Sequence, residues 1–178
     1  MRLVKAGYEI YAASFIENLP YNYDGNNLIE IAGRTCYKSE EKIAEGSADK
    51  FVKMLEEKGH TAMIEHSWEL RYYSTINLPR YEYLNYLQIF YVGTLVAGNL
   101  RAFEEWEYKG KNDYVKDTKF LKYIYNDKRW DMLSATVKFV CDTGVTHEAV
   151  RHRPPAFAQE STRYCNYSKD KFGINWLI

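Results

Sequence analysis

Apolar residues recur at helical spacing in the segment from Ser47 to Gly59. Ser47 can cap a helix there, and Gly59 follows as a C-terminal stop. The apolar stripe of this helix is formed by Phe51, Met54 and Leu55. The pattern therefore predicts a helix that ends just before His60.

Two later segments alternate between apolar and polar residues, which is typical of half-buried strands. Residues 66–76 alternate in this way, so Glu65 and His66 are expected to open a strand. Residues 136–141 alternate as well, and Asp142–Gly144 should end this second strand in a turn. The chain is thus expected to combine strands with helices.

A short helix and a bend are expected after the second strand. Thr146 can cap a helix over residues 147–153, and Pro154–Pro155 would stop it and turn the chain. This part of the sequence is therefore read as a strand, a helix and a bent loop.

The segment between about residues 79 and 131 is rich in Tyr, Lys and Asp, and helices are expected around 81–88 and 100–108. We interpret it as a helical insertion packed beside the core. Asn99 and Arg101 could lie near a ligand, but a capped surface helix explains the same residues.

Length and composition are those of one compact domain. The 178 residues, 46% of them hydrophobic, suffice for one domain and are too few for two comfortable ones. The formal net charge of zero argues against a protein that depends on broad electrostatic attraction to nucleic acid. Neither a signal peptide nor a run of transmembrane length is found, so a cytoplasmic protein without membrane contact is expected.

Cysteine and histidine spacings do not indicate a metal site. Cys36, Cys141 and Cys165 form no CxxC pair, so a disulfide framework and a zinc site are not expected, and a reducing compartment fits best. A thiol nucleophile would need a lowered pKa, and buried structural thiols are the favoured interpretation. His147 and His152 lie five residues apart, whereas a helical zinc pair needs a spacing of about four.

The densest group of cationic and hydrogen-bonding side chains lies in the stretch RHRPPAFAQESTRY, residues 151–164. Guanidinium groups present planar sets of donors that fit phosphates and carboxylates. The proline bend would let Arg151, Arg153, Ser161 and Arg163 converge on one pocket from two backbone directions. An anionic ligand is expected here, and a solvated basic turn is the alternative.

Glu148 lies three and four residues before Arg151 and His152, so one carboxylate can orient both side chains. A histidine between two arginines resists protonation and stays available to hydrogen-bond a polar ligand. We interpret Glu148 as an orienting group on the substrate side rather than as a catalytic acid.

Three ordered segments resemble the flavin-dependent thymidylate synthases, the ThyX family. The RHR triplet, seven further residues and Ser161 resemble the family signature, and residues 159–168, QESTRYCNYS, resemble its longer form. The GH and IEH elements within residues 59–66 resemble a flavin-contacting segment, and residues 32–39 resemble the N-terminal motif. The resemblance runs from about residue 28 to residue 173 and is interrupted between about residues 74 and 134.

This resemblance implies an α+β fold with a twisted, mainly antiparallel sheet flanked by helices. A single ThyX-like domain would span residues 1–178, with the C-terminal part of the family fold missing. Members of the family are homotetramers whose active sites are assembled from more than one subunit, so self-association is expected. The sequence contains no GxGxxG run, so nothing in it indicates a Rossmann fold.

The activity implied by the resemblance is the reductive methylation of dUMP to dTMP. Methylenetetrahydrofolate would donate the carbon and NADPH the electrons, with FAD as their carrier. The family is understood to work without an active-site cysteine, which agrees with structural roles for Cys36 and Cys165.

The nucleotide side of the implied site consists of four residues. Arg151 and Arg163 would neutralise the dUMP phosphate or polarise the uracil, and Ser161 would add a hydroxyl hydrogen bond. Gln159 occupies a position where the family contacts dUMP through a polar side chain. Arg163 and Ser161 are the expected catalytic residues.

The flavin side of the implied site joins two segments. His152 and Arg153 match flavin-side positions, where positive charge favours the anionic reduced ring, and Arg151 lies beside them. His60 and Glu65 would complete the flavin site from the other segment.

Two further hypotheses come from other classes. A nucleic-acid-binding module could use Arg151, Arg153 and Arg163 for phosphates, with Tyr164 and Tyr167 stacking on bases, although Lys and Arg only balance Asp and Glu. An inactive homologue that binds nucleotide or flavin without turnover is the other alternative.

Overall fold

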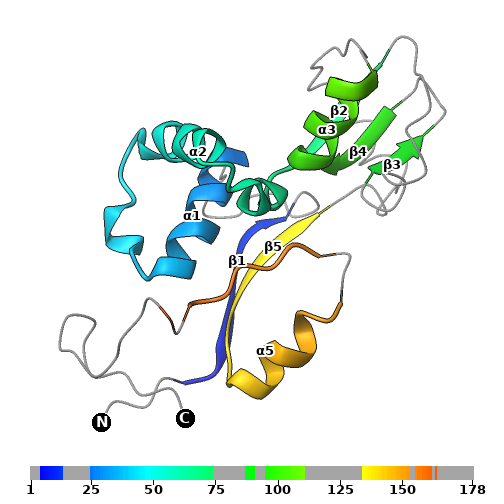
Figure 1. Cartoon of the computed structure of the whole chain (residues 1–178). Coiled ribbons are helices and arrows are strands. Elements are labelled where there is room, and N and C mark those ends of the chain that lie inside the picture. The colour runs from blue at the N-terminus through cyan, green and yellow to red at the C-terminus, as the bar shows by residue number, and fades with distance from the viewer. Residues whose placement is uncertain are drawn as a thin grey trace.

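The computed structural model describes residues 5–13, 25–73, 87–90, 95–110, 134–152, 155–161 and 163. These residues form both helices and strands (Figure 1). Their order is β1 (Gly7–Ala13), α1 (Gly25–Tyr37), η1 (Glu40–Lys42), α2 (Ser47–Glu57), η2 (Thr61–His66), β2 (Trp68–Tyr72), β3 (Leu87–Phe90), β4 (Leu95–Asn99), α3 (Leu100–Gly110), β5 (Ala135–Val140) and α5 (Thr143–Ala149).

The described strands form two small antiparallel sheets. β4 is the central strand of one sheet and pairs with β2 and β3, whereas β1 pairs with β5 in a two-stranded ribbon. The expectation of mixed helices and antiparallel strands is confirmed. In Figure 1 the β1–β5 ribbon runs away from the three-stranded sheet. Helices α1 and α2 lie to the left of this ribbon, and α5 lies to its right.

Helix α3 forms a core with the three-stranded sheet. This core consists of Tyr73, Val96, Ala102, Phe103 and Trp106, all 5% exposed or less. The helix predicted around residues 100–108 is confirmed as α3, and the Oδ1 of Asn99 caps it by accepting from the Ala102 N–H at 2.9 Å.

The other helix predicted in this range is wrong where it can be examined. Leu87 and Gln88 belong to strand β3 and pair with β4, while residues 81–86 lie outside the described residues. In the range 79–131 the described residues thus form two strands and a helix, and the strands make their sheet with β2.

A second core lies between α1, α2 and η2. Its buried members are Ile29, Val52, Leu55 and Ile64. Gly33 of α1 allows the close approach of α2, because a Cβ there would lie 2.7 Å from the Phe51 ring. The buried Glu30 carboxylate joins the same helices, since it accepts from Arg34 Nε at 2.8 Å and from Ser47 Oγ at 2.6 Å.

The helix predicted from Ser47 is confirmed as α2, with a change at its first turn. Gly46 occupies the cap position with a φ of 72°, and Ser47 is the first helical residue. Ser47 Oγ, which donates to Glu30, accepts from the Ala44 N–H at 3.0 Å. Gly59 follows the helix with a φ of 68°, so His60 lies just past its end as expected.

Glu65 and His66 do not open a strand. They form the last residues of the 3₁₀ helix η2, and strand β2 begins at Trp68. The physical reason is the burial of Ile64 in the helical core, which holds this segment against α1 and α2. The Ser67 N–H then donates to the Ile64 carbonyl at 3.1 Å and closes the last turn.

The second predicted strand is confirmed as β5, but the helix after it starts earlier than expected. The Asp142 carboxylate accepts from the N–H groups of Gly144 and Val145 at 2.7 and 3.1 Å and caps α5. Thr146 therefore lies inside the helix. Helix α5 ends at Ala149, well before the two prolines.

Candidate functional site

Residues 155–161, which we call the motif loop, contain neither helix nor strand and lie in the RHR-to-serine segment. Figure 1 shows this loop as an orange trace that passes beside β5 and β1 on its way back from α5. Its hydrogen bonds show which other segments it reaches.

The first contact of the motif loop is with the end of α1. The Ser161 N–H donates to the Cys36 carbonyl at 2.9 Å. The ammonium of Lys38 lies 3.6 Å from Glu160 Oε1. Both contacts tie the motif loop to residues 32–39, the segment predicted as the N-terminal motif.

The end of α1 is a Schellman turn, in which one residue takes a left-handed conformation. Among the non-glycine residues that the structure describes, only Lys38 has a positive φ, which is 47°. Ser39 N–H donates to the Arg34 carbonyl and Lys38 N–H to the Thr35 carbonyl, at 3.0 and 3.2 Å. The turn places Lys38 beside the loop despite the unfavourable conformation of a side-chain-bearing residue.

The second contact is with η2 through a buried histidine. The His66 ring bonds the backbone of Phe157, and its Nε2 is buried without a hydrogen-bond partner among the described residues. Burial lowers the pKa of His66, against the Phe157 bond and the charge of Glu65, which both raise it. The ring is therefore suited to its neutral form, and it ties the motif loop to the predicted flavin segment.

The third contact is with α5 itself. Gln159 Nε2 donates to Thr146 Oγ1 at 3.0 Å. The motif loop thus folds back against the helix that precedes it. Among the described residues, this loop brings together all three segments on which the predicted resemblance depends.

The predicted cationic residues lie at the surface. Arg151 pairs with Glu148 at 3.0 Å, and their side chains are 72% and 71% exposed. This is the expected contact between the two residues. His152 and Arg163 are also exposed, and Arg153 lies outside the described residues.

The predicted flavin-side residues of the other segment differ in their surroundings. His60 is exposed, and its N–H donates to the Leu55 carbonyl at 2.8 Å. The carboxylate of Glu65 is half-buried and accepts from Arg101 Nη1 at 2.6 Å. Arg101 also donates through Nε to Glu105 at 2.9 Å.

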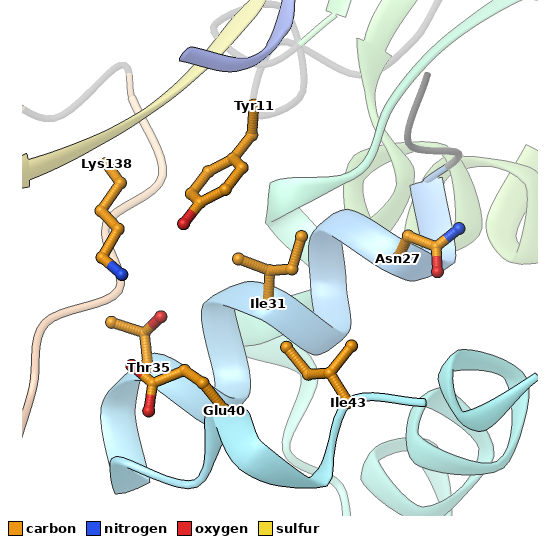
Figure 2. A pocket seen from close by; sticks show the side chains of 7 residues that line it. All are labelled: Tyr11, Asn27, Ile31, Thr35, Glu40, Ile43 and Lys138. Atoms are coloured by element: carbon orange, nitrogen blue, oxygen red, sulfur yellow. The ribbon is translucent and has the colours of Figure 1, made fainter. Parts of the chain in front are cut away.

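A small cavity lies between the ribbon and α1, as Figure 2 shows. Its volume is about 150 Å³, well below the few hundred Å³ of a typical ligand pocket. Tyr11 and Lys138 reach into it from the ribbon, and Thr35 from α1. None of the predicted site residues lines this cavity.

Sequence reasoning did not include three residues that shape the site. Arg101 contacts Glu65, Lys38 contacts Glu160, and His66 holds the Phe157 backbone. The histidine is part of the recognised IEH element, which is a signal for its role. The sequence places Arg101 near a possible ligand, but its pairing with Glu65 depends on a tertiary contact that periodicity does not reveal.

The described residues lack two further features. They contain no group of three or more His, Cys, Asp or Glu side chains that could hold a metal ion. No helix in the same part of the chain is long and apolar enough to cross a membrane.

Comparison with known proteins gives one match. The Thy1 family model, described as thymidylate synthase complementing protein, matches residues 92–177. A search of curated proteins found no match, and neither did a search of solved structures. The matched range contains the whole motif loop, together with α3, β5 and α5.

Proposed function

From the match of residues 92–177 to the thymidylate synthase complementing proteins, the ThyX family, we propose that the chain takes part in the reductive methylation of dUMP to dTMP. The co-substrates would be methylenetetrahydrofolate and NADPH, with FAD as cofactor. The match supports the predicted family through its RHR-to-serine signature, while residues 32–39 and 59–66 lie outside the matched range. The single observation that carries the proposal beyond the match is the motif loop, whose bonds join it to α1, η2 and α5.

The chemistry of the donors fits anionic ligands. Arg151, His152 and Arg163 are exposed, so their donors can meet a phosphate or a flavin without first leaving a buried partner. Arg151 must share its charge with Glu148, and that pair is well hydrated and weak. FAD, when bound, would supply the hydride that completes the methyl group.

On the nucleotide side, Arg163 and Arg151 would bind the phosphate or polarise the uracil. Ser161 would donate or accept through its hydroxyl, and its backbone is fixed because its N–H is bonded to the Cys36 carbonyl. Gln159 would contact dUMP after exchanging its exposed bond to Thr146. In this proposal Arg163 and Ser161 carry the catalytic contacts, and Glu148 orients Arg151.

On the flavin side, His60, Glu65, His152 and Arg153 would contact the cofactor, and Arg151 would lie at the border of the two ligands. Positive charge at Arg153 would stabilise the anionic reduced ring, and His152 would add a hydrogen bond. His66 would contribute indirectly, because it holds the motif loop against η2 through the Phe157 backbone.

A complete site requires more surface than the cavity described above provides. A volume of about 150 Å³ does not accommodate a nucleotide, and the predicted site residues do not line this cavity. We therefore include self-association in the proposal, with a homotetramer whose sites are shared between subunits. Sedimentation of the purified protein would measure this directly.

The function is tested by cofactor content and turnover of the purified protein. We expect a bound-flavin absorption spectrum, dUMP binding and release of tritium from the uracil ring when all cofactors are present. Binding without tritium release would identify a non-catalytic nucleotide-binding homologue. A colourless protein that shifts oligonucleotides at low salt would instead favour a nucleic-acid-binding module.

A further inference from the structure

A hydrogen bond from Arg101 joins the first turn of α3 to η2, the element that carries Glu65, and a second bond from Arg101 stays within α3. Arg101 Nη1 donates to Glu65 Oε1 at 2.6 Å, and Arg101 Nε donates to Glu105 Oε1 at 2.9 Å. Two nitrogens of one guanidinium thus bind two carboxylates from different elements. The planar guanidinium fixes the angle between these bonds, which a lysine ammonium would not do.

The backbone around this pair is held by three further contacts. Trp68, the first residue of β2, pairs with Asn99, the last residue of β4. The Leu100 N–H donates to the carbonyl of buried Ser67 at 2.8 Å, and Asn99 Oδ1 caps α3. The register of the two strands therefore determines that Arg101 faces η2.

The pair is too exposed to serve mainly for stability. The side chains of Arg101 and Glu65 are 37% and 32% exposed, and pairs of this kind contribute little to the free energy of unfolding. The hydrogen bonds to Glu105 and Glu65 raise the pKa of Arg101, so the guanidinium stays charged. The Arg101–Glu65 contact also restricts the orientation of the Glu65 carboxylate.

We propose that Arg101 is a positioning residue, which fixes the Glu65 carboxylate in the orientation needed for its contact with flavin. The inference rests on the proposed function, in which Glu65 belongs to the flavin side. Arg101 binds Glu65 through Oε1, and the second carboxylate oxygen, Oε2, would contact the ligand. The β4–α3 corner, within the segment predicted to be an insertion, thereby contributes to the site.

The test compares the FAD affinity of variants of the full chain, and fluorescence titration measures this affinity. Arg101→Gln should weaken FAD binding about tenfold, and Arg101→Lys should recover roughly a third of that loss because it restores charge without the fixed geometry. Glu105→Gln is the matched control, since it neutralises the other partner of Arg101 and leaves the Glu65 carboxylate in place. It should change affinity less than about threefold.

A double-mutant cycle separates positioning from a general structural effect. In a Glu65→Gln background, Arg101→Gln should have no further effect on FAD affinity. An equal loss in both backgrounds would contradict the proposal, as would a loss accompanied by a matching decrease in melting temperature. Full affinity in Arg101→Gln would overturn it as well.

A measurement without flavin distinguishes this inference from the proposed function. In the ligand-free protein, the side-chain carboxyl ¹³C signal of Glu65 should shift in Arg101→Gln and stay in place in Glu105→Gln. If the wild-type chain takes up no FAD while this signal responds as expected, the proposed function fails and the pairing stands. If the signal does not respond to Arg101→Gln, the positioning role is wrong whatever the chain binds.

Discussion

Cations in two regions of the molecule have opposite surroundings. At the sheet formed by β2 and β4, Arg71 is 5% exposed and pairs with Glu69 and Glu107 at 2.7 and 2.6 Å. Around α5 and the motif loop, Arg151 is 72% exposed and pairs with one equally exposed carboxylate, while Arg163 is exposed. The same residue type is thus enclosed by acids in one region and open to water in the other.

The difference separates structural charges from charges that are available to a ligand. Burial alone would lower the pKa of Arg71. The bond to Glu107 and the charge of Glu69 outweigh burial and raise this pKa. Its guanidinium also lies 4.4 Å from the centre of the Phe103 ring, so its donors and one face are occupied. An exposed arginine keeps its donors in water, and a phosphate can replace that water at small cost.

The largest effect is expected when the buried arginine is removed. Arg71→Ala should lower the free energy of unfolding by about 3 kcal/mol, because it leaves the Glu107 and Glu69 carboxylates partly buried without their partner. Urea unfolding followed by tryptophan fluorescence measures this. Arg151→Ala is the matched control, and its effect should stay below about 1 kcal/mol. Equal losses in the two variants would remove the distinction between the regions.

The next effect concerns binding rather than stability. Arg163→Ala should weaken dUMP binding by about tenfold or more and FAD binding far less, since the proposal assigns this guanidinium to the nucleotide. Calorimetric titration of each ligand measures the division. Equal losses for both ligands would show that Arg163 does not distinguish the two sides of the site.

A smaller change in stability should follow when a buried hydroxyl is removed. Tyr73 is fully buried and donates to the Glu107 carboxylate, and burial raises the pKa of Tyr73. Tyr73→Phe should cost about 1.5 kcal/mol, because the hydrogen bond to a charged group is lost while the ring remains. A thermal or urea unfolding curve indistinguishable from wild type would mean that this network contributes nothing to the fold.

The smallest effect is a dependence of stability on pH that comes from His66, the η2 residue bonded to the motif loop. Because the pKa of His66 is lowered, the folded state binds fewer protons than the unfolded state between its folded pKa and about pH 6.5. The contribution of the neutral ring is present above this pH and is lost as the pH falls through the folded pKa. His66→Gln should therefore lose less stability than wild type between pH 7.5 and 5. Parallel curves for the two proteins would contradict the buried neutral state.

The parts of the fold predicted correctly are those decided by local patterns. The apolar stripe of α2, the alternation in β5 and the Gly98–Asn99 start of α3 each act within a few residues. Local patterns do not decide between two neighbouring residues that can both cap a helix. Asp142, and not Thr146, caps α5. Packing of Ile64 also kept η2 helical in a place where alternation predicted a strand.

The candidate site was predictable as a set of segments but not as a set of contacts. The recognised elements indicated which stretches belong together, and the Ser161–Cys36 and His66–Phe157 bonds join them. No periodicity determines such long-range contacts, or that Arg101 would reach Glu65. The exposure of Arg163 also follows from how the loop packs rather than from its own sequence.

The most direct test of the account is a comparison of dUMP with deoxyuridine, which differs only in lacking the phosphate. The central claim is that exposed guanidinium groups at the motif loop bind an anionic nucleotide. Calorimetry on the flavin-loaded protein should show dUMP binding at least about tenfold tighter than deoxyuridine, with the difference decreasing at high salt. Equal affinities for the two ligands, or no binding of either, would contradict the claim.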